Sequence, residues 1–396
     1  MIIQKRDVNG RFTSETYEEN NPIEALTDDR EQIYKDEISN LRRLLKQSYR
    51  EQNINEELRK FAFELGKTKL KTPQWLSPKK IKGHEGIPHL FLSDWHWGEV
   101  VVDKEISGLN SYNLEIAQKR CEKIFDNFID TYTNRIAPFN YDGCVVALGG
   151  DMVSGTIHDE LLETNDVDIM AQVVSMTEHL IAGLEKIVET FNKVAVFCVV
   201  GNHGRNTKDK RFKRKTHQSF DWLSYQMLDK YFAKNNDIHF VIPEGSDVLY
   251  KIYNTTYLLT HGDSLGRGGG GAVGMLGPVS TGDQKRRNRQ MGLGSPYDVL
   301  ICGHFHQLSM LPSKIVNGSL KGFDEYAYGL GLPPEPPAQA SWLTHPTKGV
   351  TIQVPVFCSE EEDAVDNYSQ WISWQKEDLE YGGSGSKSTS SIKASL

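Results

Sequence analysis

The chain has 396 residues, of which 38% are apolar and 25% are charged, and its formal net charge is −8 at neutral pH. This composition is typical of a globular protein with a sizeable core, and the acidic balance excludes a protein that coats nucleic acid uniformly. No apolar run approaches the ~18 residues of a membrane span, and the first residues lack the apolar stretch of a secretory signal. The five cysteines are unclustered, so we expect buried free thiols in a cytoplasmic protein.

The first 86 residues are expected to form an extension that precedes the main domain. Residues 1–28 are polar and predicted to be disordered. Over residues 29–71, apolar side chains recur in two sets that step four, three and four residues, which predicts a helical segment. This spacing is typical of a coiled-coil seam, which would make the protein a homodimer, but a helix packed on its own domain fits equally well. Pro73 and Pro78 end the helical segment, and a linker follows to residue 86.

Beyond residue 86, helical and strand-like segments alternate along the chain. Apolar stripes at helical spacing predict helices at 114–132, 170–191 and 220–231. Short apolar runs bounded by loops predict strands that are buried on both faces. These runs cover residues 87–92, 144–148, 194–200, 257–260 and 298–302. The alternation is typical of an α/β fold, in which ligands bind at the carboxyl ends of the strands.

Two later segments complete this part of the chain. Residues 331–340 are rich in proline and are predicted to be a loop, and residues 349–357 have the pattern of a strand. A long loop is predicted between the last two strands of the alternating series, and it opens with a glycine run.

Each of the five predicted strands is followed by a residue that can bind a metal ion. Asp94 and His96 follow the first strand, and an extended backbone would place both side chains on one face. The later strands are followed by Asp151, by Asn202 and His203, by His261 and Asp263, and by His304 and His306. Because the carboxyl ends of the strands meet at one edge, we expect these side chains to form one cluster.

The composition of this cluster indicates its chemistry. Imidazole and carboxylate ligands suit divalent ions such as Mn²⁺, Fe²⁺ or Zn²⁺. Seven candidate ligands are too many for one tetrahedral zinc ion, but they suit two ions about 3.5–4 Å apart that share a bridging carboxylate. Asp151 is the natural bridge, because it stands alone at its strand end.

Five short motifs occur in an order that resembles the calcineurin-like metallophosphoesterases. They are D-x-H-x-G (94–98), G-G-D (149–151), G-N-H (201–203), a strand-end His261, and G-H-x-H (303–306). The resemblance extends over about residues 87 to 320 and implies a four-layer αββα sandwich with two central mixed sheets. It also implies a metallophosphoesterase domain over residues 87–360. The composition of residues 361–396 predicts an acidic segment and a flexible tail.

The resemblance further implies how the site residues share two divalent ions. The first ion would be held by Asp94, His96, Asp151 and His306. The second ion would be held by Asp151, Asn202, His261 and His304. His203 would be an outer-sphere acid that protonates the leaving oxygen or steadies the transition state. Mn²⁺ is the first candidate metal, with Fe²⁺, Zn²⁺ and Mg²⁺ as alternatives.

The sequence departs from the family pattern in two places. Many family members have an acidic residue after Asn-His, where this chain has Gly204 followed by Arg205. The protein Ser/Thr phosphatases of the superfamily have Asp and Arg where this chain has Ser154 and Gly155. These departures weaken an assignment to the phosphoprotein phosphatases and do not touch the metal ligands.

Two basic runs, residues 205–215 and 285–289, suggest a polyanionic substrate. The first follows directly on the Asn202-His203 motif, and the second lies in the long loop predicted before the strand that leads to His304. Either run could be an ordinary solvent-exposed face, or both could line a groove for nucleic acid. The candidate substrate contacts are Arg205, Lys210, Arg211, Lys213 and Arg214. Trp95, Trp97 and Phe305 could stack on bases or pack in the core.

The leading hypothesis is therefore a metal-dependent phosphodiesterase that acts on nucleic acid, first of all a DNA nuclease. Within the superfamily it resembles the DNA-repair exonucleases and their phage-encoded relatives. A phosphomonoesterase or a small-nucleotide phosphodiesterase is the alternative, with the basic runs merely solvated. A scaffold subunit without metal is a third hypothesis, which the intact ligand set disfavours.

Overall fold

The structure is a computed structural model that describes residues 86–136, 141–266 and 274–359 in full. Outside these ranges it gives helical residues 39, 42 and 43 and the backbone of two antiparallel strand pairs. These strands are β1 (Ile3–Arg6) with β2 (Phe12–Glu15), and β14 (Gln370–Gln375) with β15 (Thr389–Lys393). The chain divides into two units, Met1–Lys69 and Leu70–Leu396. The rest of the predicted helical segment over 29–71, the linker to residue 85 and the glycine run at 267–273 lie outside the described residues.

The larger of two central sheets has six strands in the order β13-β12-β3-β4-β5-β6. Strands β3 to β6 are parallel, whereas β12 runs antiparallel to both of its neighbours. In chain order the strands are β3 (Ile87–Leu92), β4 (Cys144–Leu148), β5 (Val194–Cys198), β6 (Ile238–Val241), β12 (Ala338–His345) and β13 (Gly349–Phe357). The carboxyl ends of β3, β4 and β5 therefore meet at one edge of this sheet.

The smaller sheet has five strands in the order β10-β11-β9-β8-β7. Strand β9 is parallel to β8 and β11, and the outer pairs are antiparallel. The strands are β7 (Asp247–Ile252), β8 (Thr255–Thr260), β9 (Val299–Cys302), β10 (Ser309–Leu311) and β11 (Lys314–Val316).

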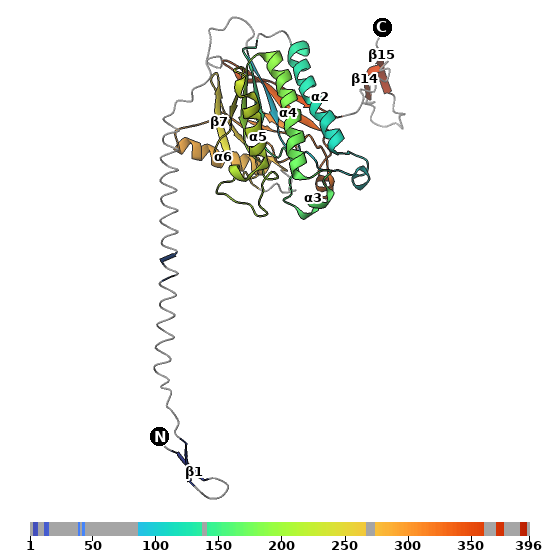
Figure 1. Ribbon diagram of the computed structural model, residues 1–396. Helices are drawn as coiled ribbons and strands as arrows, with labels where there is room; N and C mark the ends of the chain where they lie inside the picture. Colours follow the sequence, from blue (N-terminus) through green and yellow to red (C-terminus); the bar gives the residue numbers. More distant parts are fainter. Residues whose placement is uncertain are drawn as a thin grey trace, which may run out of the picture. The chain divides into compact units, whose positions relative to one another are not determined.

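Helices cover the outer face of each sheet. Figure 1 shows α2 (Leu114–Asp130), α4 (Ile169–Phe191) and α5 (Phe220–Tyr231) side by side over the larger sheet. Helix α6 (Leu276–Gly292) packs on the smaller sheet. Two shorter helices, α3 (Asp159–Thr164) and α7 (Glu325–Gly329), lie in connections between the longer elements. The layers are thus helix, sheet, sheet, helix, as the family resemblance implied.

The burial of alternate side chains explains why the sheets stack. All six residues of β3 are buried, with Leu90 packing toward the helices and Phe91 packing between the two sheets. Successive side chains of a strand point to opposite faces, so a strand that is buried throughout fills two layers at once. Tyr257 and Ile301 of the smaller sheet complete the layer between the sheets. Val279 of α6 packs in a third cluster against the outer face of the smaller sheet.

The predicted helices and strands of the alternating region are found with small shifts at their ends, but two segments differ. The proline-rich loop predicted at 331–340 ends early, because β12 begins at Ala338 and pairs on both sides. The basic run 285–289 lies in α6 rather than in a loop. Helix α6 was not predicted because it has no continuous apolar stripe. Its close approach to Leu265 depends instead on Gly282, where a β-carbon would clash.

Two compositional expectations concern cysteines and membrane spans. All five cysteines are buried and unpaired, as predicted. Within the described ranges, no helix combines the length and the apolar character needed to cross a bilayer.

Candidate metal centre

The loops that follow β3 and β4 run side by side. The Asp94 N–H donates to the Gly150 carbonyl at 3.0 Å, and the His96 N–H donates to the Asp151 carbonyl at 3.1 Å. A β-carbon at Gly150, whose φ is +86°, would lie 2.1 Å from the Gly201 nitrogen, so only glycine allows this approach. Asp94 and His96 have left-handed backbones rather than the extended one we predicted. They converge because the chain coils at the strand end, not because they alternate along a strand.

The first group of donor atoms combines Asp94, His96 and His306, whose nearest ligand atoms lie within 4.8 Å of one another. His96 Nε2 is 3.0 Å from His306 Nε2, and His306 Nε2 is 3.5 Å from Asp94 Oδ1. Asp94 and His96 are fully buried. The segments after β3 and β9, which belong to different sheets, therefore meet at this point.

The second group combines Asp151, His261 and His304. His261 Nε2 lies 3.0 Å from Asp151 Oδ2 and 3.2 Å from Asn202 Oδ1. A third group joins Asp151 to His96 and His203 and so links the other two. Asp151 thus shares one donor group with His261 and His304 and another with His96 and His203. The structure brings together all seven predicted ligands and His203.

Contacts outside the centre fix the orientation of the histidine rings. His261 Nδ1 donates to the Gly149 carbonyl at 2.8 Å, and His203 Nδ1 donates to the Ser154 carbonyl at 3.0 Å. A carbonyl only accepts hydrogen bonds, so each Nδ1 carries a proton and each Nε2 is the ring nitrogen that faces the centre. Such outer partners are a regular feature of histidines that bind metals.

The donor set fits divalent cations. His96 Nε2 and His306 Nε2 lie 3.0 Å apart, a distance that fits either a hydrogen bond from one ring to the other or a cation that both rings bind. Among the described residues, the buried Asp151 Oδ2 accepts no hydrogen bond. Burial lowers the pKa of His261, but the neighbouring Asp151 carboxylate outweighs this effect and raises that pKa to about 9. The centre therefore demands positive charge, which a metal ion would supply in place of a proton.

The backbone of the centre is held in uncommon conformations. Nine non-glycine residues in the described ranges have positive φ, and five of them are predicted ligands. These five are Asp94, His96, Asp151, His304 and His306, with φ of 55°, 48°, 52°, 72° and 56°. Sparsely populated conformations of this kind cost of order ~1–3 kcal/mol each and cluster at functional sites.

A carboxylate that the sequence did not point to holds two of the loops together. The buried Asp221, in the first turn of α5, accepts the N–H groups of Asp151, Met152 and Gly201 at 3.1, 3.2 and 2.9 Å. A β-carbon at Gly204 would lie 2.9 Å from this carboxyl group. Asp221 therefore fills the space beside position 204, where many members of the resembled family have an acidic residue. No local pattern links Asp221 to residues that lie up to 70 positions away.

A second unpredicted carboxylate, Glu99, faces His96 from the other side. Glu99 Oε2 lies 3.1 Å from His96 Nδ1, and Glu99 Oε1 lies 2.7 Å from Lys321 Nζ. The buried Lys321 also pairs with Asp324 at 2.6 Å. Despite burial, which opposes ionisation, Lys321 holds the pKa of Glu99 well below its usual range. Glu99 is therefore a positioning residue that orients His96, and it lies only three positions after it.

Replacing Glu99 by glutamine should weaken Mn²⁺ binding about 10- to 100-fold, the range typical of a lost outer partner of a ligand histidine. The measurement is competition with a fluorescent chelator at fixed pH. The matched control is Glu115→Gln, which removes a carboxylate paired with Lys119 on the surface of α2. If the variant binds Mn²⁺ as tightly as the parent protein, Glu99 pairs with Lys321 but does not orient His96 for metal binding.

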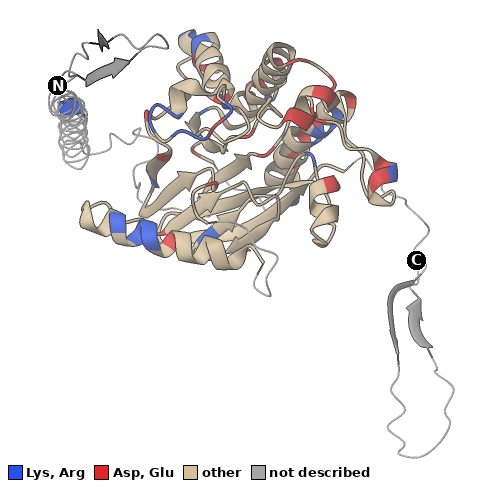
Figure 2. Ribbon diagram, turned by 90° about the horizontal axis from the view of Figure 1, so that it is seen from below, with Lys and Arg blue, Asp and Glu red and all other residues tan. Residues whose placement is uncertain are grey.

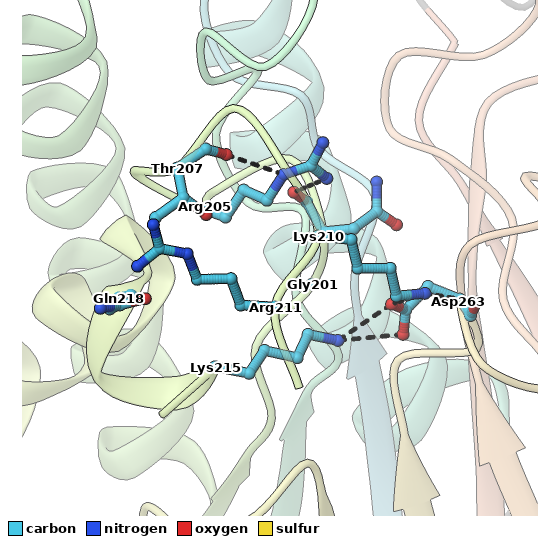
Figure 3. A pocket seen from close by; sticks show the side chains of 9 residues that line it. Gly201, Arg205, Thr207, Lys210, Arg211, Lys215, Gln218 and Asp263 are labelled. Atoms are coloured by element: carbon cyan, nitrogen blue, oxygen red, sulfur yellow. Dashed lines mark hydrogen bonds and ion pairs between the residues drawn. The ribbon is translucent and has the colours of Figure 1, made fainter. Parts of the chain in front are cut away.

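The first basic run is only partly available for a substrate. The Arg205 guanidinium donates to the carbonyls of Asn202, Thr207 and Lys208 and so braces its own loop. Lys210 pairs with Asp263 at 2.9 Å, and Figure 3 shows Lys210 and Lys215 both pointing at that carboxylate. The pocket in this figure is lined by Gly201, Asn202, Arg205, Thr207, Lys210, Arg211, Lys215, Gln218 and Asp263.

Four of the five predicted substrate contacts, Lys210, Arg211, Lys213 and Arg214, are exposed. Arg205 and Lys210 nevertheless have structural partners, because the loop needs them to close on itself and on Asp263. Asp263, which follows His261 by two positions, serves as this anchor and is not in any of the three donor groups.

The second basic run and the two tryptophans have structural roles. In α6, Arg287 pairs with Asp283 and Arg289 pairs with Asp247, and Figure 2 shows the basic and acidic segments together on this helix. Trp95 and Trp97 are fully buried in the core beneath the helices, so they cannot stack on a base. Phe305 is partly buried and packs against the cluster beside α6.

Comparisons with known proteins give fold likenesses of low similarity. No protein-family model and no curated protein matches the sequence. A Vps29 variant from Entamoeba histolytica shares 13% identity at a TM-score of 0.26, covering 68% of this chain and 99% of its own. A predicted phosphoesterase from Streptococcus pneumoniae TIGR4 shares 9% identity at 0.24, with coverages of 69% and 99%. A putative 5'-nucleotidase from Staphylococcus aureus shares 9% identity at a TM-score of 0.31, covering 69% of this chain and 55% of its own. At these scores the likenesses assign neither a family nor an activity.

Proposed function

We propose that this protein is a binuclear metal-dependent phosphodiester hydrolase that acts on nucleic acid, with DNA as the first candidate substrate. One observation carries the proposal. Aspartate, histidine and asparagine side chains from five strand ends, distributed over two sheets, converge on one buried centre. The order of their motifs resembles the calcineurin-like metallophosphoesterases and supports the same class of chemistry.

The ligands divide between two ions that share Asp151. One ion would be held by Asp94, His96, Asp151 and His306. The other would be held by Asp151, Asn202, His261 and His304. When bound, two such ions activate water as a nucleophile and polarise the phosphoryl oxygens. Mn²⁺ is the first candidate for a site of imidazole and carboxylate donors, with Fe²⁺, Zn²⁺ and Mg²⁺ as alternatives.

His203 is the candidate for the residue that supplies a proton. Its Nδ1 is held by the Ser154 carbonyl, so Nε2 faces the centre. Burial lowers the pKa of His203 to about 3, which keeps the ring neutral before substrate arrives. An anionic phosphoryl group in contact with Nε2 would favour the protonated ring. The ring could then give its proton to the leaving oxygen, as a general acid does.

The argument for nucleic acid rests on the exposed cations beside the centre. Arg211, Lys213 and Arg214 follow the Asn202-His203 segment in a protein of net charge −8, and three local cations near a phosphoesterase centre favour a polyanion.

A specific observation favours a second candidate substrate, a small phosphate ester. Arg205 and Lys210 are already engaged with protein groups, so the positive surface is smaller than the sequence suggests.

One assay separates these functions. The protein with Mn²⁺ is given linear DNA, bis-p-nitrophenyl phosphate and p-nitrophenyl phosphate in parallel. Hydrolysis of DNA and of the diester supports the proposal, whereas hydrolysis of the monoester alone would favour a phosphomonoesterase. A protein that binds metal and hydrolyses none of the three would contradict the catalytic proposal altogether.

Replacing Arg211, Lys213 and Arg214 by glutamine should flatten the salt dependence of DNA binding. Each lost phosphate contact lowers the log–log slope by ~0.7–0.9, so three contacts lower it by roughly 2–3. Fluorescence anisotropy over a range of salt concentrations measures this slope. The matched control replaces Lys193, Lys230 and Lys234, which are equally exposed and lie outside this loop. An unaltered slope would make the run a solvated face and would favour the small-ester alternative.

A further inference from the structure

Phe212 is the most exposed large apolar side chain among the described residues, at 87%. An exposed phenylalanine gives up the stabilisation that burying its ring would contribute. It lies in the middle of the sequence Lys210-Arg211-Phe212-Lys213-Arg214. A ring held in water between cations is poorly explained by folding, so we asked what it could contact.

The loop that carries Phe212 is anchored at both ends. Lys210 and Lys215 both reach Asp263, at 2.9 and 3.0 Å. The Thr216 hydroxyl donates to the Glu244 and Gly245 carbonyls at 3.1 and 3.2 Å. The anchored residues thus flank a short tip, residues 211–214.

The tip itself is built to present side chains to a ligand. All four of its residues are exposed. Arg214 has a left-handed backbone, with φ of 56°, which turns the chain sharply beside Phe212. In Figure 3, Arg211 extends away from Asp263 and toward Gln218, in contrast to Lys210 and Lys215.

Two segments that carry proposed metal ligands also contact the loop that carries the tip. Asn202, a proposed ligand, lines the same pocket as Arg211. Asp263, the anchor of the loop, comes two residues after His261. A strand whose phosphodiester lies in the centre would therefore have neighbouring nucleotides within reach of the tip.

We propose that Phe212 stacks on an unpaired nucleobase, and that the substrate is single-stranded nucleic acid or a single-stranded end. This inference rests on the proposed function, because it names the form of nucleic acid that the same centre cleaves. In a duplex the base faces are covered by neighbouring bases, whereas in a single strand they are open to an aromatic ring. The cations on both sides of Phe212 would pair with the flanking phosphates.

The charge of the tip favours a nucleic acid over other partners. Cations lie on both sides of a single apolar ring, so the phosphates on either side of a stacked base would each meet a positive charge. A protein partner or a lipid surface would require a larger continuous apolar area than one phenylalanine supplies. Binding of a protein partner or of a lipid surface through Phe212 would therefore contradict the inference.

The test measures binding of the full-length protein with Mn²⁺ to a fluorescent phosphorothioate thymidine 20-mer, which resists hydrolysis. Stacking on an aromatic ring is worth about 1–3 kcal/mol per base, so Phe212→Ala should weaken binding about 5- to 150-fold. Binding of a blunt duplex of the same length should change less than about two-fold. Phe212→Trp should keep the affinity, and the fluorescence of the added indole should be quenched by the single strand and not by the duplex.

The control variant is Tyr231→Ala, which removes an exposed aromatic ring at the far end of α5. Its affinity for the single strand should equal that of the parent protein. Equal affinities of Phe212→Ala and the parent, or equal losses on single strand and duplex, would overturn the inference. If the parent protein binds phosphatidylserine vesicles and Phe212→Ala does not, while both bind the oligonucleotide equally, the inference is overturned in favour of a membrane contact.

Failure of the proposed function can be told from failure of this inference. Hydrolysis of bis-p-nitrophenyl phosphate by the parent protein reports on the centre alone, since this ester carries no nucleobase. If the parent hydrolyses it while Phe212→Ala binds the single strand normally, only the stacking inference fails. If the parent does not hydrolyse it while Phe212→Ala loses single-strand binding selectively, the catalytic proposal fails and the stacking contact remains.

Discussion

Replacing Asp151 by asparagine should abolish phosphodiester hydrolysis and lower the bound metal from two ions to one or none. Asp151 Oδ2 is fully buried, accepts no hydrogen bond among the described residues, and lies 3.0 Å from His261 Nε2. Asparagine keeps the shape and can still accept the His203 N–H through Oδ1, a bond of 2.6 Å. The substitution therefore removes the charge shared by both donor groups with little change in packing.

Two measurements together check this result: elemental analysis of the purified protein, and turnover of bis-p-nitrophenyl phosphate with added Mn²⁺. The matched control is Asp283→Asn, because Asp283 is also a buried carboxylate with charged partners but lies in α6. Asp283→Asn should keep both metal ions and the parent turnover, because Asp283 pairs with Arg287 and Lys314 and belongs to none of the donor groups. If Asp151→Asn binds two ions and still turns over, the proposed centre is wrong.

Replacing His203 by alanine should lower turnover by ~10²–10⁴-fold while both metal ions are retained, since proton transfer by a side chain contributes about this much. His203 faces the same space as His96, with ring centroids 4.5 Å apart, but its proposed role is proton donor rather than ligand. The loss should be smaller for p-nitrophenyl esters than for alkyl esters. A good leaving group needs less protonation, so it depends less on an acid.

The neighbouring His158 offers a matched control. Its ring lies 5.7 Å from that of His203, yet it is exposed and belongs to none of the donor groups. His158→Ala should lower turnover far less than His203→Ala does. Equal losses of His203→Ala for alkyl and p-nitrophenyl esters would exclude the role of acid, and loss of metal would make His203 a ligand.

The strand ends could be predicted from the sequence because their signal is local. Apolar runs such as 144–148 stand between loops, and an Asp, Asn or His follows each run within three residues. The backbone at these ends could not be predicted in the same way. Asp94 and His96 were expected to share the face of an extended strand, but a left-handed turn and the close approach at Gly150 bring them together. This geometry depends on the neighbouring strand, which lies about 50 residues further along the chain.

The supporting residues were missed for a related reason. Asp221 acts through backbone groups of distant loops, so its own surroundings in the sequence carry no signal. The role of a cation was equally hard to predict. Lys210 and Arg211 are adjacent and chemically similar, yet Lys210 pairs with Asp263 while Arg211 points elsewhere. Only the folded loop distinguishes an anchoring cation from an exposed one.

The centre draws on both sheets, and this arrangement has a mechanical consequence. Asp94, Asp151 and Asn202 follow strands of the larger sheet, whereas His261 and His304 follow strands of the smaller one. Any sliding of one sheet over the other would change the distances between donors that hold a single ion. The thickness and stiffness of the layer between the sheets, filled by side chains such as Phe91 and Tyr257, therefore set the spacing of the ligands.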